Sequence, residues 1–343
     1  MGAHLVIERP GLFSTLQDAG RFGYQRFGIS ASGAMDPFAL ALANALVGNP
    51  RGMAAVELTM LGLSATVEGG PLRLALAGAD MALTIDGRPA EGWRAYALQP
   101  GARIEIGPAR AGMRAYLAIA GGFAVPPTLG SLSTHSRSGI GGLEGRALRA
   151  GDRLALNGAP AGPLLALPPS HRPAARGPFR VLLGPQDDHF TPEGVATFLS
   201  SDYRVSDKAD RMGAQLDGPQ IAHRDGFNIV SDGIVNGAIQ VPGHGRPVVL
   251  LADRQTTGGY PKIATVIGPD LWRLGQARPG DVLRLSAVTA EEAEAASRAH
   301  EAELAALIAA MVEEAGPAGL SSERLLSHNL VGGVCSALDT DHA

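Results

Sequence analysis

The sequence predicts a mostly β protein with a few helices. Glycine accounts for 46 of the 343 residues and aromatic residues for only 5%, a composition that favours turn-dense β structure when the apolar runs are short. A glycine turn followed by an alternating strand occurs three times, at Leu98–Ile106, Leu148–Leu156 and Ala277–Leu285. We interpret this repeat as one turn-and-strand unit that is used several times to close a β sheet. Chance similarity of three short segments is the alternative. Further segments have strand length, and several of them alternate or are β-branched: HLVIE, AVELTM, LRLALAG, ALTIDG, AYLAIAGG, FRVLLG, AIQV and VVLLA.

Capping signals predict three helices. Asp36 is a good N-cap for a helix that has proline at its first position and glycine just past its end. Thr191 begins a shorter helix, again with proline at the first position. Thr289 forms a capping box with the glutamate three residues later and begins a helix over about 290–315. We expect the apolar face of this last helix to pack on the body of the protein, with packing against another protein chain as the alternative: Leu304, Leu307, Ile308, Met311 and Val312.

A proline-rich stretch divides the chain. Four prolines occur between Leu165 and Phe179, which predicts a stiff, extended connector. We therefore expect a first β-rich domain at residues 1–165, a linker at 166–178, a second β-rich domain at 179–288, and a C-terminal helix with a loose tail at 289–343.

Charge and cysteine content narrow the class of protein. A net charge of −4 gives no indication of nucleic acid or of an anionic membrane as partner. The longest uncharged stretch, residues 115–134, is interrupted by glycine and proline, so we expect no membrane-spanning helix. Cys335 is the single cysteine, which excludes a disulfide within the chain and fits a reducing compartment. The first residues lack the basic region of a signal peptide, and we expect a cytoplasmic protein.

Familiar catalytic and cofactor motifs are missing from the sequence. No lysine follows a glycine, so there is no phosphate-binding P-loop. The segment Gly139–Gly145 resembles a dinucleotide loop, but its Glu144 would repel phosphate. Asp187–Phe190 reads as a surface turn rather than as a metal site, and no metal is expected. The chain also lacks the Met-Lys-Met sequence to which biotin is attached.

Three polar, glycine-rich segments remain: Thr15–Asp36, Ser206–Gly218 and Ser231–Lys262. Each places aspartate and arginine close together, with glycine where the backbone must bend. One such segment is most simply a turn fixed by side-chain hydrogen bonds. Three in one chain, with glutamine, tyrosine and lysine gathered between Asp253 and Lys262, favour a functional site, and we expect the segments to face a shared cleft between the two domains.

These segments carry a resemblance to a known family. The motifs STLQDAGRFGYQRFGISASGAMD, AYLAIAGGF, GGLEGRALRAGD, DRMGAQLDGP, SDGIVNGAIQVPG and DRQTTGGYPKIATV together resemble the biotin-dependent carboxyltransferase-like family. That family includes the C subunit of 5-oxoprolinase, proteins similar to allophanate hydrolase subunit 2, and the antagonist of a sporulation-kinase inhibitor. The resemblance extends over residues 7–285, which is nearly the whole predicted pair of β-rich domains.

The resemblance implies a pair of cyclophilin-like β barrels and a separately encoded B-like partner subunit. In 5-oxoprolinase the B and C subunits act with an A subunit to open the lactam of 5-oxoproline to glutamate at the expense of ATP. The chain is then expected to be a hydrolase subunit in a heteromer, with a small lactam or amide as substrate and ATP shared with the partner. The alternatives are a carboxyltransferase component that moves carboxyl from carboxybiotin to a urea-like acceptor, and a non-catalytic antagonist of a kinase-inhibitor protein.

Such chemistry requires charge around a carbonyl oxygen that becomes more negative. Arg254 is expected to grip an oxyanion or carboxylate, Lys262 to place a point charge on a transferring phosphoryl group, and Asp253 to orient Arg254 or act as base. Lys262 is one of only two lysines, the other being Lys208. Glycine at 258 and 259 would let backbone N–H groups approach a cofactor. The expected cofactor contacts are Gly258 and Gly259, and the expected substrate contacts are Gln255, Thr256, Thr257, Tyr260, Gln240, Gln17, Asp18, Arg21 and Arg211.

Overall fold

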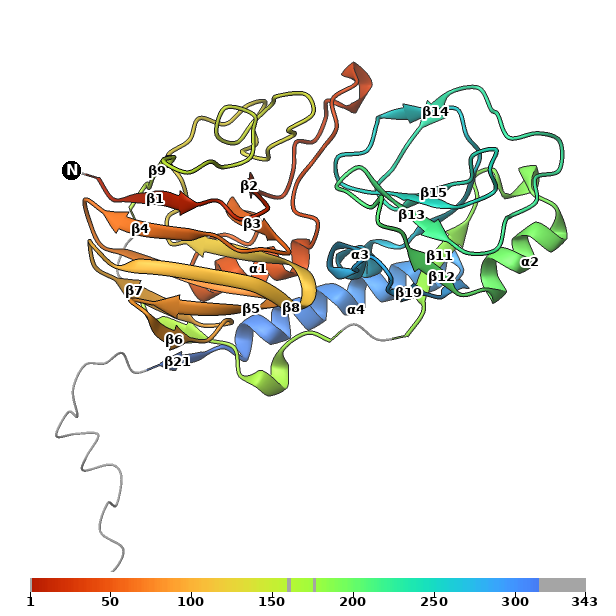
Figure 1. The fold of residues 1–343 in the computed structure, drawn as a ribbon. Coiled ribbons are helices and arrows are strands. Elements are labelled where there is room, and N and C mark those ends of the chain that lie inside the picture. The colour runs from red at the N-terminus through yellow and green to blue at the C-terminus, as the bar shows by residue number, and fades with distance from the viewer. Residues whose placement is uncertain (1, 159–161, 175–176, 315–343) are drawn as a thin grey trace, which may run out of the picture.

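The computed structural model describes residues 2–158, 162–174 and 177–314 (Figure 1). Cys335 and the tail predicted after Pro317 lie outside these residues. None of the described helices is long and apolar enough to cross a membrane. The described α-helices are α1 (Pro37–Leu46), α2 (Pro192–Ser200), α3 (Leu271–Gln276) and α4 (Ala290–Ala309).

The N-terminal half forms a curled nine-stranded sheet. Its main strand order is β2-β3-β8-β4-β1-β9, and β5 pairs with β6, β7 and β8. The sheet curls because the long strand β8 pairs with β5 over most of its length and also with β3 and β4. The strands are β1 (His4–Arg9), β2 (Phe13–Gln17), β3 (Ala55–Thr59), β4 (Ser64–Glu68), β5 (Leu72–Ile85), β6 (Arg88–Ala90), β7 (Ala95–Leu98), β8 (Arg103–Ile119) and β9 (Arg153–Ala155).

The two faces of this sheet bury different partners. Leu5, Val56 and Leu117 belong to the core enclosed by the curl. Leu40 and Leu46 of α1 instead pack against alanines of β5 and against β8. Small side chains on β5 let the helix approach closely, and Asp36 accepts a hydrogen bond from Ala39 N at 2.8 Å as the N-cap, as the sequence predicts.

The C-terminal half forms an eight-stranded sheet with its own core. The strand order is β19-β12-β13-β16-β15-β18-β11-β20. Phe198 of α2 packs into this core beside Tyr203, and Thr191 caps α2 as predicted. The strands are β11 (Phe179–Leu183), β12 (Tyr203–Val205), β13 (Gly213–Asp217), β15 (Ala238–Gln240), β16 (Val248–Leu250), β18 (Lys262–Val266), β19 (Val282–Leu283) and β20 (Leu285–Ala287).

The repeated turn is the same structure in all three places. Gly101, Gly151 and Gly280 have φ of 92°, 89° and 91°, a left-handed region that side chains with a Cβ rarely enter. Each glycine leads into a strand, namely β8, β9 and β19. The prediction of a mostly β protein assembled with this turn-and-strand unit is therefore confirmed.

The C-terminal helix joins the two halves. In Figure 1, α4 runs beneath both sheets, and its Leu304 and Leu307 pack with Phe38 and Leu42 of α1, as predicted. The prediction that this helix reaches residue 315 is wrong, because it ends at Ala309.

Strand pairing ends the helix early. Residues 312–314 form β21 (Val312–Glu314), which pairs with β10 (Leu164–Ala166) in the proline-rich connector. Glu314 also contacts Arg94 at 2.6 Å. Pairing with a distant strand thus outweighs local helix propensity. The connector, predicted to be extended throughout, contains this strand and a short 3-10 turn at Pro169–His171.

Candidate functional site

The polar turn between β16 and β18 is buried at both ends and exposed in the middle. Asp253, Arg254 and Lys262 are buried, whereas Gln255, Thr257 and Tyr260 are exposed. In the middle of the turn, β17 (Thr257–Gly258) pairs with β14 (Asp232–Gly233). The two ends are consequently fixed, and they face different surroundings.

Lys262 is engaged by a carboxylate of the same chain. Its Nζ lies 2.8 Å from Asp232 Oδ2, and the ammonium holds the pKa of Asp232 below its ordinary value. Gln186 completes the group: its Oε1 accepts from Lys262 N at 3.1 Å, and its Nε2 donates to Asp232 at 3.2 Å. Only 3% of the lysine side chain is exposed, against 51% of Asp232. Lys262 therefore forms an ion pair in which the lysine is buried and the aspartate is half-exposed. The sequence did not identify either partner, Asp232 or Gln186.

The glycines of the turn pack against Gln240. A Cβ on Gly258 would lie 2.6 Å from Gln240 Nε2 and 2.7 Å from Ile234 Cδ1, so a side chain here would displace the ends of both neighbouring side chains. Gln240 is buried and donates to Tyr260 O at 3.2 Å. Gly259 O accepts from Ile229 N at 2.9 Å. Close packing thus accounts for Gly258 without a cofactor.

Arg254 points at backbone carbonyls. Its Nε donates to Ile234 O at 3.1 Å and its Nη1 to Leu251 O at 3.4 Å. Burial lowers the pKa of this guanidinium. Its own carbonyl accepts a hydrogen bond from Ser30 Oγ of the first polar segment. Arg254 thus fixes the turn to its surroundings, and Asp253 orients a different arginine.

That arginine is Arg211, which connects the two halves of the protein. It donates to Asp253 from Nε at 2.8 Å and from Nη2 at 3.0 Å. On the other side it donates to Glu57 Oε1 at 2.5 Å and to Gly33 O at 2.7 Å. Burial alone would lower the pKa of Arg211, but Glu57 and Asp253 together raise it. The predicted proximity of the second and third polar segments is therefore observed.

The network continues into the N-terminal half. Glu57 Oε2 accepts from the Tyr116 hydroxyl at 2.7 Å, and that hydroxyl accepts from Asp36 N at 2.7 Å. Gln276 of α3 donates to Asp36 Oδ2 at 2.7 Å. Burial raises the pKa of Asp36 to about 6 and that of Tyr116 well above its ordinary value. Glu57 carried one signal in the sequence, because it is a lone charge inside the apolar strand AVELT.

The first polar segment has a mainly structural role. Asp18 accepts from Ser131 Oγ at 2.7 Å and from Leu132 N at 2.6 Å. Arg21 donates to Thr128 O at 2.9 Å and to Ser133 O at 2.8 Å, and Gln17 donates to Thr134 O at 3.0 Å. These three residues, predicted as substrate contacts, hold the loop at 128–134 through hydrogen bonds.

The same segment then extends to the C-terminal half. Gln25 Nε2 donates to Ile234 O at 2.8 Å, and Figure 1 shows the loop after β2 rising beside β14. The loop between β8 and β9 makes a second crossing, because His135 Nε2 lies 3.4 Å from Asp253 O. All three polar segments thus meet near the boundary between the two halves, although few of their side chains line the same pocket.

A pocket of about 490 Å³ lies between the two halves. Asp253 and Arg211 contribute to its wall, whereas Lys262, Gln240 and Arg254 do not. The volume suits a small organic ligand. The apolar wall comes from Leu12, Phe13, Met60, Met113, Ala209, Met212 and Pro279, and the charged wall comes from Arg114, Arg137, Asp207, Asp210, Arg211 and Asp253.

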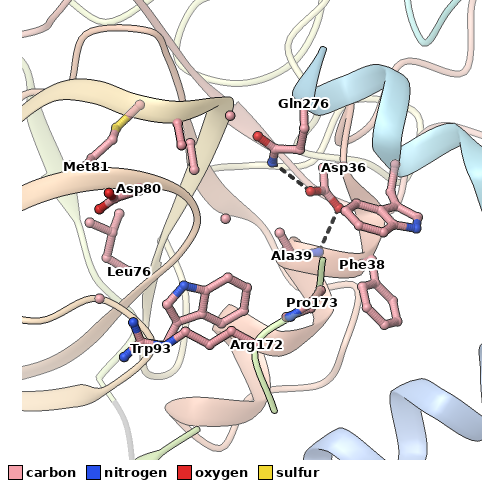
Figure 2. A pocket seen from close by; sticks show the side chains of 16 residues that line it. Asp36, Phe38, Ala39, Leu76, Asp80, Met81, Trp93, Arg172, Pro173 and Gln276 are labelled. Carbon is pink, nitrogen blue, oxygen red and sulfur yellow. Dashed lines mark hydrogen bonds between the residues drawn. The ribbon is translucent and has the colours of Figure 1, made fainter. Parts of the chain in front are cut away.

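A second pocket, of about 420 Å³, lies at the far end of the network (Figure 2). Both tryptophans of the chain, Trp93 and Trp272, line it. Figure 2 shows the Asp36 carboxylate held between Gln276 and the backbone of Ala39 at its edge. None of the predicted site residues lines this pocket, so the pocket between the halves is the better candidate for the functional site.

The described residues contain no group of three or more His, Cys, Asp or Glu side chains arranged to hold a metal ion. Asp187–His189 form a 3-10 turn before α2. The charged side chains that line the candidate pocket are carboxylates and guanidinium groups.

Comparisons with known proteins identify the family. Residues 27–287 match the carboxyltransferase domain, subdomain A and B. The chain is 38% identical to the C subunit of 5-oxoprolinase from Escherichia coli over 84% of this chain and 93% of that protein. It is 35% identical to the C subunit of 5-oxoprolinase from Haemophilus influenzae over 84% and 92% of the two chains.

The fold is shared with a larger enzyme. The crystal structure of the K. lactis urea amidolyase matches 94% of this chain with a TM-score of 0.84 and 28% identity, but only 20% of that chain is covered. The protein therefore belongs to the family of the carboxyltransferase domain, subdomain A and B.

Proposed function

We propose that this chain is the C subunit of a 5-oxoprolinase-type enzyme that hydrolyses a small lactam or amide at the expense of ATP. The observation that carries the proposal is the match to the C subunit of the Escherichia coli 5-oxoprolinase over 93% of that protein's length. Urea amidolyase shares the fold as a fifth of a far longer chain, so likeness to it predicts less about a free-standing subunit. With a single cysteine in the sequence, we place the enzyme in the cytoplasm.

The pocket between the halves is the proposed site of the lactam. Its apolar wall suits the ring, and Asp253 faces it with a carboxylate held by two hydrogen bonds from Arg211. Because Arg211 also pairs with Glu57, one guanidinium is shared by two carboxylates. This arrangement leaves Asp253 acceptor capacity for a lactam N–H or for a water that attacks the carbonyl.

The turn between β16 and β18 has two features that count against a nucleotide site within this chain alone. The positive charge of Lys262 is neutralised by Asp232 at 2.8 Å, and Gly258 is packed against Gln240. The Lys262 ammonium is therefore not free to act as the cation of a phosphate-binding loop. We propose that ATP binds only in the assembly, at a site shared with or supplied by the partner.

Exposed apolar residues on segments that contact one another support the need for a partner. Val230 is 92% exposed and Phe22 is 72% exposed. These residues lie on two segments that contact each other through Gln25 and Ile234, beside the Lys262–Asp232 pair. We call this set the apolar patch, and it comprises Phe22, Phe27, Phe227, Val230, Val235 and Tyr260. Exposed clusters of this kind mark interaction surfaces, and the proposed occupant is the B-like subunit.

Reconstitution tests the proposal. The chain would be purified alone and together with B-like and A-like 5-oxoprolinase subunits, and lactam-dependent ATP hydrolysis would be measured over a panel of lactams. We expect negligible activity from the chain alone and turnover from the complete assembly. Full turnover by the single chain, or none by the assembly with any lactam, would refute the proposal.

A carboxyltransferase role is the second candidate, and the TM-score of 0.84 to urea amidolyase favours it. The chain has no biotin attachment sequence of its own, so this role requires a carboxybiotin carrier on another protein. Carboxylation of urea by the chain and such a carrier, without any lactam-dependent ATP hydrolysis, would identify it. Stable binding of the B-like subunit without either activity would instead indicate a regulatory antagonist.

A further inference from the structure

The pocket between the halves contains three guanidinium groups, and two of them are already engaged. Arg211 donates to Glu57, Asp253 and Gly33 O. Arg114 donates to Gly275 O at 2.6 Å and lies 3.8 Å from Glu57. Both side chains are buried. Their charges therefore serve the network that joins the two halves.

Arg137 differs from both. It lies in the loop between β8 and β9, is exposed, and contributes to the wall of the pocket. Its Nη1 contacts the thioether sulfur of Met212 in the C-terminal half, which is a weak acceptor. Among the residues that the structure describes, no carboxylate lies within ion-pair distance of Arg137. The pocket thus has one guanidinium whose charge is available to a ligand.

The proposed substrate class has a group that requires such a charge. 5-Oxoproline, the lactam named for the relatives, carries a carboxylate on the ring as well as the amide. Arginine recognises a carboxylate through two parallel hydrogen bonds. Asp207, Asp210 and Asp253 also line the pocket and would repel that carboxylate. Its binding there requires a cation without a carboxylate partner, and Arg137 is that cation among the described pocket residues.

We propose that Arg137 binds the carboxylate of the substrate and so makes the enzyme specific for lactams that carry an acid group. This inference rests on the proposed function. The ring then lies against Met60, Met212 and their apolar neighbours, with the amide directed toward Asp253. Arg137 acts in binding and takes no part in bond breaking.

Two substrates and three variants test the assignment in the reconstituted assembly. The substrates are 5-oxoproline and 2-pyrrolidone, the same ring without the carboxylate. For Arg137→Gln we expect kcat/KM on 5-oxoproline to fall about 30- to 100-fold, mainly through KM, because one charged partner is lost. The value for 2-pyrrolidone should change less than about three-fold. Arg137→Lys should recover part of the loss, and Arg88→Gln, an exposed arginine on β6, should behave as wild type.

An equal loss on both substrates, or no loss on either, would overturn the assignment. If the wild-type assembly turns over no lactam, the proposed function fails, and the pocket is tested separately by calorimetric titration of the isolated chain. Binding of 5-oxoproline that Arg137→Gln abolishes, with no binding of 2-pyrrolidone, would still support Arg137. No binding of either ligand, or binding that the substitution leaves unchanged, would refute it.

Discussion

Replacing Arg211 by methionine should destabilise the protein more than any exposed charge substitution. The arginine is buried between Glu57 and Asp253, whose side chains are 1% and 8% exposed. Methionine fills similar space but donates no hydrogen bond, so two buried carboxylates lose the cation that holds them. Removing one partner of a buried ion pair typically costs about 3–5 kcal/mol. Because Arg114 remains 3.8 Å from Glu57 and screens part of the repulsion, we expect about 4 kcal/mol.

The assay is thermal and urea unfolding of the isolated chain at neutral pH. For a chain of 343 residues that unfolds as one unit, each kcal/mol shifts Tm by about 1.4 °C, so Arg211→Met should lower Tm by about 6 °C. Arg246→Met is the matched control. Arg246 also contacts an aspartate, Asp217 at 2.9 Å, but both side chains are 48% exposed, so we expect a loss below about 1 kcal/mol.

The difference in stability between Arg211→Met and Arg246→Met tests whether the buried ion pairs stabilise the protein. If Arg211→Met costs no more than Arg246→Met, the buried network contributes nothing to holding the halves together. Lowering the pH should also reduce the loss in unfolding free energy caused by Arg211→Met, because protonation of Glu57 or Asp253 removes a buried charge that has lost its cation. A loss that grows toward pH 4 would contradict this electrostatic explanation.

Three further predictions concern the site and its surroundings. We expect the partner to release Lys262 from Asp232 for the transferring phosphoryl group, so Lys262→Met, which keeps the buried stem and removes the charge, should lose about 10²–10³ in rate in the assembly. Tm should change little, because the Asp232 side chain left without its cation is 51% exposed; Lys208→Ala is the control, and activity within a few-fold of wild type would remove the amine from the chemistry. Burial raises the pKa of Asp36 from 3.8 to about 6, so its contribution to stability should fall by about 2.4 kcal/mol as pH rises from 4 to 7, and urea unfolding of Asp36→Asn should lack this slope. Phe27→Asp combined with Val230→Asp should abolish co-purification with the B-like subunit at unchanged Tm, and retained binding would place the partner elsewhere.

The sequence predicted those helix starts and turns that depend only on residues close together in the chain. Asp36 and Thr191 cap helices because a short polar side chain can reach the N–H three residues later. Gly101 and its two equivalents mark turns because no other residue adopts their backbone conformation easily. The end of α4 was predicted wrongly because β21 pairs with β10, a strand nearly 150 residues away. Helix α3 was not predicted because it has only six residues and no capping side chain.

The candidate site was predicted as a set of segments and only partly as a set of contacts. Polar residue types identified Asp253 and Arg211, which do meet. Glu57 was missed because it is 154 residues from Arg211 in the chain, and only the fold brings the two together. Asp232 was missed as an individual residue because its role depends on the β14–β17 pairing that places it beside Lys262.

Many polar side chains lie between Asp253 and Lys262 because the two ends of this turn contact different parts of the molecule. At its first end, Asp253 contributes to the pocket between the halves through the pair with Arg211. At its last end, Lys262 and Asp232 lie beside the apolar patch. Only the short pairing of β14 with β17 separates the ends. A lactam in the pocket and a partner on the patch would therefore act on the same ten residues, so docking of the partner can reposition Asp253 without a long-range conformational change. On this argument a partner that binds normally but fails to contact the β14–β17 pair should leave the enzyme inactive.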